Sequence, residues 1–144
     1  MTAAQRLYTT ELLALAVELA DYPPLDAASA HGEARSPTCG STLGIDLALD
    51  DSGRVARLGL RVRACAVGQA SAAIFARHAR GRDLDGIRDM LDRLEAWLDD
   101  EGPAPEWPDL ALVAPARAYP GRHGAMLLPW KAAAAALSSA APAG

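Results

Sequence analysis

Two cysteines are the residues of this chain best suited to metal or sulfur chemistry, because a thiolate both binds metal ions and attacks sulfur. Cys39 follows a loop that contains Pro37 and precedes a predicted strand, whereas Cys65 follows a strand and precedes small residues typical of a helix. A thiol at the start of a helix lies at the positive end of the helix dipole, which favours the thiolate. The competing interpretation is that both cysteines are small buried hydrophobic residues. Two cysteines this far apart in sequence are not by themselves a metal-binding signature.

The elements that must position these cysteines are predicted to form an α+β fold with a small antiparallel sheet. Leu43–Leu49 alternates between apolar residues and polar or small ones, which is typical of a strand with one buried face. Asp50–Gly53 is predicted to be a turn. On the return path, the chain that follows this turn, the apolar residues change from odd to even positions near Ala56. We therefore expect a bulge or a break there, and three short antiparallel strands in all. Leu25–Pro37 is expected to be a loop, with His31 exposed to solvent.

Helices are predicted where apolar residues recur at helical spacing, and the fold is expected to place them on one face of the sheet. Thr9 or Thr10 can cap the first helix and Asp83 the third, because their side chains accept hydrogen bonds from free backbone amides. The expected helices cover Tyr8–Ala20, Ala66–Arg80, Asp83–Asp99, a short segment from Pro108, and a last segment from Arg122 or Pro129 to Ser139. The residues expected in the core are Leu43, Ile45, Leu47, Leu60, Val62, Ile74, Leu91 and Leu94.

Three arginines lie on the same side of the predicted return path, opposite to the side of its apolar residues. They are Arg57, Arg61 and Arg63. Two interpretations stay open for them: a face that docks a partner, or the solvated face of a sheet.

Length and composition limit the class of protein. The 144 residues are expected to form a single domain over 1–144, with a frayed tail over 140–144. A net charge of −4 argues against general binding of nucleic acid, which requires a basic face. No apolar run reaches the length of about 20 residues that spans a bilayer, so no membrane association is expected. Two cysteines without export features suggest a cytoplasmic protein with free thiols.

Four segments, in order along most of the chain, resemble the IscU/NifU-type (SufU-like) family of iron–sulfur cluster assembly scaffolds. Two of them hold the cysteines and match the family's Pro-x-Cys-Gly-Asp loop and its Gly-Cys-Ala-x-x-x-Ala-Ser segment. The other two match its first helix and its last motif, Pro-x-Arg-x-x-Cys-x-x-Leu-x-Trp. The segments are Pro37–Gly40, Cys65–Ala72, Tyr8–Leu13 and Tyr119–Trp130.

The resemblance implies a three-stranded antiparallel sheet packed against about five helices, and a site in which Cys39 and Cys65 bind metal. Two departures change that site. The family's ligand aspartate is Ser41 here, and its third cysteine is Ala125. His123, two residues before Ala125, could supply a third ligand through an imidazole nitrogen, or it could be a surface histidine.

The resemblance leads us to expect a non-enzymatic, divergent scaffold that binds iron, an iron–sulfur cluster or zinc weakly through Cys39 and Cys65. Its implied partners are a cysteine desulfurase and cluster-acceptor proteins, and homodimer formation stays open. One alternative is a relative that binds no metal and serves as a protein-interaction module in cluster assembly. A second is a small zinc-binding or sulfur-accepting protein of the same family.

Overall fold

Three antiparallel strands form one sheet in the computed structural model of this chain, which describes residues 9–37 and 40–140. The strands are β1 (Ala30–Arg35), β2 (Thr42–Leu49) and β3 (Val55–Arg63), and β2 is the central one. Cys39, Tyr8 and the predicted frayed tail beyond residue 140 lie outside the described residues. The predicted α+β fold class is confirmed.

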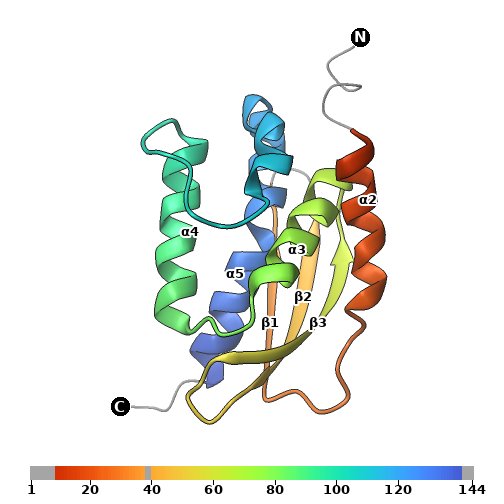
Figure 1. Cartoon of the computed structure of the whole chain (residues 1–144), viewed down its shortest axis with the longest axis vertical. Helices are drawn as coiled ribbons and strands as arrows, with labels where there is room; N and C mark the ends of the chain where they lie inside the picture. Colours follow the sequence, from red (N-terminus) through yellow and green to blue (C-terminus); the bar gives the residue numbers. More distant parts are fainter. Residues whose placement is uncertain (1–8, 38–39, 141–144) are drawn as a thin grey trace.

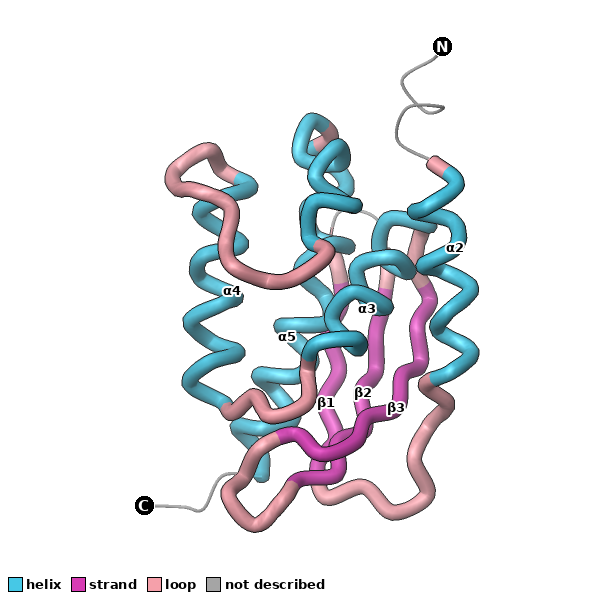
Figure 2. Tube along the Cα trace, viewed as in Figure 1, coloured by secondary structure: helices cyan, strands magenta, loops and turns pink. Residues whose placement is uncertain are grey.

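The helices pack on one face of this sheet, as predicted (Figure 1). Helix α5 packs against β1 and β2, α3 packs against α5 and α2, and α4 packs against α5. Figure 2 shows the strands side by side, with the helices in front of them and to either side. The α-helices are α2 (Thr10–Glu18), α3 (Ala66–His78), α4 (Leu84–Leu98) and α5 (His123–Ala140), and the 3-10 helices are η1 (Leu19–Asp21), η2 (Leu110–Ala118) and η3 (Pro120–Arg122).

The third strand is not where the sequence pattern suggested. We expected a bulge or a break in the return path, three short strands in all, and a loop over Leu25–Pro37. Instead, β3 is one strand, and β1 lies within the expected loop. The sequence of β1 alternates small residues with charged ones and lacks the β-branched and aromatic residues that mark strands. Its pairing with β2, and the packing of α5 on its small residues, make it a strand.

The predicted irregularity of the return path is confirmed as a bulge. Leu49 pairs with Val55, whereas its neighbour Ala48 pairs with Arg57, so Ala56 is an extra residue on β3. The bulge returns the apolar side chains of β3 to the buried face, which accounts for the change from odd to even positions. Gly53 has a φ of +77° in the turn that precedes β3, as the predicted turn requires.

The residues predicted to cap the first and third helices do so in the structure. The Thr9 hydroxyl accepts a hydrogen bond from the Leu12 amide at 3.1 Å, and an Asp83 carboxylate oxygen accepts one from the Gly86 amide at 2.9 Å. Helix α5 starts at His123 and continues through Pro129, which therefore does not mark its start. None of the helices over residues 9–37 and 40–140 combines the length and the hydrophobicity that a membrane span requires.

The core contains most of the residues expected in it. Leu43, Ile45, Leu47, Leu60, Ile74 and Leu94 are buried. Val62 and Leu91, also expected in the core, are only partly buried and pack against its edge. Leu91 lies on the rim of the apolar stripe of α4, where Ile87, Leu94 and Leu98 form the buried centre.

The position of Leu91 sets the expected cost of removing its side chain. Leu91→Ala should lower the free energy of unfolding by about 1 kcal/mol, below the roughly 2–5 kcal/mol typical of a fully buried leucine, because the cavity opens to solvent. Urea denaturation of the wild type and the variant measures this difference. Leu94→Ala is the matched comparison on the same helix and should cost more. Equal costs for the two variants would contradict this assignment of core and rim.

Candidate functional site

The two segments that carry the cysteines leave the sheet at the same end. Thr42 at the start of β2 pairs with Arg35 of β1 on one side and with Arg63 of β3 on the other. The loop over residues 36–41 therefore joins β1 to β2 at this row, and Cys65 follows β3 by two residues at the same row. This arrangement supports the prediction that the two cysteine segments lie close together, although Cys39 itself is outside the described residues.

Hydrogen bonds connect the described residues on the two sides of this loop. The Ser36 amide donates to the Ser41 carbonyl at 2.8 Å, and the Gly40 amide donates to the Ser36 carbonyl at 3.1 Å. Gly40 has a φ of +71°, a conformation that glycine adopts without a steric penalty. Ser36 and Ser41 are both buried. The position at which the family has an aspartate thus holds a buried serine.

Cys65 is the N-cap residue of α3, as the sequence predicted. It has extended backbone angles, with φ −63° and ψ 170°, and its thiol is free and partly buried. Its side chain makes no capping hydrogen bond, and the first turn of α3 contains no acidic residue. The thiol therefore lies at the positive end of the helix dipole, without a neighbouring carboxylate in that turn.

Ala125 lies against the first turns of α3. A Cβ atom added to Gly68 would be 3.3 Å from the Ala125 Cβ and 2.7 Å from the Ala64 Cβ, so Gly68 allows α5 to approach the start of α3. One turn further on, the Ser71 hydroxyl donates to the Met126 carbonyl at 2.7 Å, a buried hydrogen bond that fixes the two helices together. The position of the family's third cysteine is thus next to the segment of Cys65, but it carries only a buried methyl group.

His123, the third predicted ligand, is the first residue of α5 and is partly buried. Its Nε2 lies 2.7 Å from the Arg117 carbonyl oxygen. A carbonyl only accepts hydrogen bonds, so Nε2 carries a proton and only Nδ1 is left for a metal ion. Arg117 is itself fixed, because its guanidinium donates to the Trp97 carbonyl at 2.7 Å and lies over the Trp97 ring. His123 therefore already has a structural hydrogen bond.

The donors present fit a cluster or a tetrahedral metal poorly. Over residues 9–37 and 40–140, no three His, Cys, Asp or Glu side chains lie close enough together to hold a metal ion. The sequence-predicted metal residues that can be placed, Cys65 and His123, supply one thiol and one imidazole nitrogen. A structural zinc site has four donors. Any metal bound here must draw on Cys39, water or a second protein.

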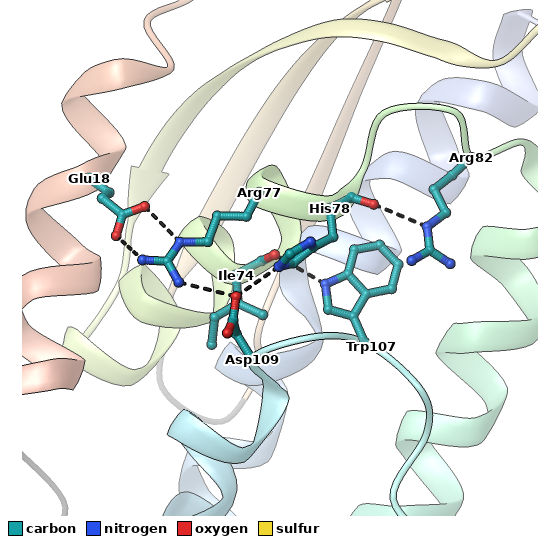
Figure 3. A network of polar contacts seen from close by, with 7 residues as sticks. All are labelled: Glu18, Ile74, Arg77, His78, Arg82, Trp107 and Asp109. Atoms are coloured by element: carbon teal, nitrogen blue, oxygen red, sulfur yellow. Dashed lines mark hydrogen bonds and ion pairs between the residues drawn. The ribbon is translucent and has the colours of Figure 1, made fainter.

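A second cluster of polar side chains lies away from this site and connects α2, α3 and the start of η2 (Figure 3). Arg77 donates to Glu18 through two nitrogens and to Asp109 at 3.2 Å, and His78 Nε2 lies 2.8 Å from the same Asp109 oxygen. The hydrogen bond from His78, together with Arg77, lowers the pKa of Asp109 against the opposing effect of burial. We interpret this cluster as a structural connection, because each charged group is paired within it.

Sequence reasoning missed one polar group, the buried carboxylate of Asp46 on the outer face of the sheet. The Asp46 side chain is only 2% exposed, and its oxygens accept hydrogen bonds from Arg61 at 2.8 Å, His31 Nδ1 at 2.7 Å and the Leu25 amide at 3.1 Å. Burial would raise the pKa of Asp46, but these hydrogen bonds outweigh it and hold the pKa below its ordinary value. His31 was predicted to be a loop residue and instead lies in β1. The only signal in the sequence was an aspartate inside an apolar strand.

Comparisons with known proteins give close structural neighbours. No protein-family model matches the chain, and no curated protein matches it. The crystal structure of a nitrogen-fixing NifU-like protein (N-terminal) from Brucella abortus matches with a TM-score of 0.85 and 31% sequence identity, over 96% of this chain and 97% of that one. A putative iron–sulfur cluster assembly scaffold protein for the SUF system from Fervidobacterium islandicum matches with a TM-score of 0.78 and 19% identity, over 92% and 97% of the two chains.

Proposed function

This chain belongs to the IscU/NifU-type family of iron–sulfur cluster assembly scaffolds, and we propose that it is a divergent scaffold that holds iron, a cluster or zinc weakly through Cys39 and Cys65. The observation that carries the proposal is the position of Cys65, a free thiol at the start of α3 beside the ends of β1 and β2. A thiol at this place can accept metal or sulfur from a second protein, since it is partly exposed.

Weak binding follows from the shortage of donors. Ser41 is a poor substitute for a carboxylate because its hydroxyl is neutral and hard to deprotonate, and Ala125 offers no donor at all. His123 could add its Nδ1, since Nε2 is hydrogen-bonded to a carbonyl. Water, or a group from a partner, would complete the coordination. A cluster on this chain should therefore be labile or shared between two chains.

The partners that fit this function are a cysteine desulfurase, which supplies sulfur, and proteins that accept the finished cluster. Family membership supports both. We expect no catalytic step on this chain itself, because a scaffold contributes ligands and a docking surface.

A second candidate function is a protein-interaction module that carries no metal. It is favoured by the buried methyl of Ala125 and the buried serine at position 41, both of which replace family ligands. Under this function the chain would bind the same assembly proteins without receiving iron or sulfur.

Metal content separates the two functions. Protein purified without oxygen should contain substoichiometric iron or zinc that is lost in Cys39→Ala and in Cys65→Ala, and reduced in His123→Ala. His31→Ala is the matched control, because His31 is a histidine on the sheet face away from the helices, and it should leave metal content unchanged. Equal metal in the wild type and in the Cys39→Ala/Cys65→Ala double variant would exclude the scaffold, and a wild type without bound metal would favour the interaction module.

Restoring the missing ligands should strengthen the site. The double variant Ser41→Asp/Ala125→Cys is expected to bind zinc about tenfold more tightly than the wild type, a change of about 1.4 kcal/mol, because it returns a carboxylate and a thiolate to a site that lacks them. Competition with a colorimetric chelator measures the affinity. Ser52→Asp/Ala111→Cys adds the same groups at exposed positions outside the site and is the matched control. Equal affinities for the wild type and the restored variant would show that the loops do not converge, or that another residue already completes the site.

A further inference from the structure

The outer face of the sheet, opposite the helices, carries a charged groove. Strand register places three cross-strand rows on this face: Arg35, Thr42 and Arg63; then Glu33, Gly44 and Arg61; then His31, Asp46 and Gly59. The first two rows line an open groove of about 480 Å³. The third row is covered at Gly59, where an added Cβ atom would lie only 2.9 Å from the Leu25 amide nitrogen, whereas His31 at its other end is exposed.

The groove is held open by fixed parts of the fold. Gly44 has no side chain and is buried, because the Arg61 guanidinium lies over it, 3.0 Å from where a Cβ atom would be, and lines the groove there. Arg61 is bound to Asp46 at 2.8 Å. The same carboxylate binds the Leu25 amide, and the Leu60 amide donates to the Tyr22 carbonyl at 2.9 Å, so the segment that covers Gly59 is fixed too.

The charge of the groove is unbalanced. Arg35 and Arg63 flank Thr42 and are both exposed, and neither has an ion-pair partner among the described residues. Glu33 is the acidic residue among the described residues that line the groove. The groove is positively charged, whereas the chain as a whole has a net charge of −4. Arg57 is not part of it, because it lines a different hollow together with Asp21 and Asp26. The arginines of β3 therefore do not form one continuous face.

We propose that this groove docks an extended, acidic segment of a partner protein. Neighbouring strands are about 4.8 Å apart, so Arg35 and Arg63 are anchored about 10 Å from each other, a spacing that suits several carboxylates better than one small anion. An extended segment presents carboxylates on one side about every 7 Å. Arginine binds carboxylates through two parallel hydrogen bonds, which gives both attraction and orientation. Thr42 lies between them in the same cross-strand row.

The groove lies next to the two segments that carry the cysteines. Arg35 directly precedes the loop over residues 36–41, and Arg63 is two residues before Cys65. A partner bound across this row would be held next to both cysteine segments. This docking surface does not depend on metal being bound there, so its failure and the failure of the scaffold function are separate results.

Fluorescence anisotropy with a labelled peptide of alternating glutamate and serine, about ten residues long, tests the proposal. The wild type should bind this peptide at low salt and lose it as salt rises, and it should not bind a glutamine–serine peptide. Arg35→Glu/Arg63→Glu should weaken binding about tenfold or more, and Arg35→Gln/Arg63→Gln should weaken it less. Arg57→Glu/Arg80→Glu changes the charge equally at exposed positions outside the groove and should bind like the wild type. Circular dichroism melts confirm that the variants fold.

Four results would overturn the proposal. The first is no binding of the acidic peptide by the wild type. The second is an equal loss in the Arg57→Glu/Arg80→Glu control, which would show only a general charge effect. The third is displacement of the peptide by inorganic phosphate at the same concentration of charge, which would indicate a small-anion site. The fourth is displacement by a single-stranded DNA oligonucleotide at a lower concentration than unlabelled peptide, which would indicate a nucleic-acid site.

Discussion

Gly32→Ala is expected to lower the free energy of unfolding by about 3 kcal/mol or more, a cost at the upper end for an added methyl group. Gly32 is on β1 and faces α5. A Cβ atom at this position would clash with the Ala132 carbonyl oxygen, and it would lie 2.6 Å from the Ala136 amide nitrogen and 2.9 Å from the Ala136 Cβ. Backbone atoms of a helix cannot move aside as a flexible side chain can. The strand or the helix must therefore shift, which separates surfaces that are close-packed.

Thermal or urea unfolding of Gly32→Ala measures this cost. Gly44→Ala is the matched control on the neighbouring strand, because its new methyl group would meet only side-chain atoms of Arg61, at 3.0 Å, and no backbone atom. It should change stability by less than about 1 kcal/mol, with a small gain from reduced freedom of the unfolded chain as an offset. If Gly32→Ala were as stable as Gly44→Ala, α5 would not pack on β1 as closely as the structure has it.

Asp46→Ala is expected to cost about 2–3 kcal/mol, because it removes a buried carboxylate that accepts three hydrogen bonds, two of them from side chains. The cost is at the low end for a broken buried ion pair, since the Arg61 side chain is 47% exposed and can be solvated. The Leu25 amide loses its partner, so the segment that covers Gly59 should loosen as well. Hydrogen exchange at Leu25 should be faster in the variant.

The pH dependence of stability shows whether the charge of the Asp46 side chain, and not only its shape, stabilises the fold. Because the folded-state pKa of Asp46 is below its ordinary value, its contribution to stability is complete above that ordinary value of about 3.9 and is lost as pH falls through the folded-state pKa. Asp46→Asn should therefore be less stable than the wild type at pH 7, and the difference should shrink as pH falls below about 4. A difference in melting temperature that stays constant down to pH 2 would contradict this role for the charge.

The sequence by itself determined the elements whose signals are local. Asp83 and Thr9 mark helix starts because a short side chain can reach the free amides of the first turn. The apolar stripe of α4 and the alternation of β2 predict a helix and a strand because each periodicity matches one backbone geometry. The position of Cys65 at the start of α3 follows from the same local pattern. The motif order along the chain was enough to indicate the family.

Only the tertiary structure decided the rest, because it depends on contacts between residues far apart in the chain. β1 has weak strand propensity and is a strand because Gly32 allows α5 to cover it. Asp46 occupies a polar position in the alternation of β2, and it is buried because the segment around Leu25, 21 residues away in sequence, crosses that face of the sheet. The same crossing separates Arg57 from Arg61 and Arg63, which turned one predicted arginine face into a short groove. Periodicity reports which side of an element is polar, but not whether a distant segment will cover it.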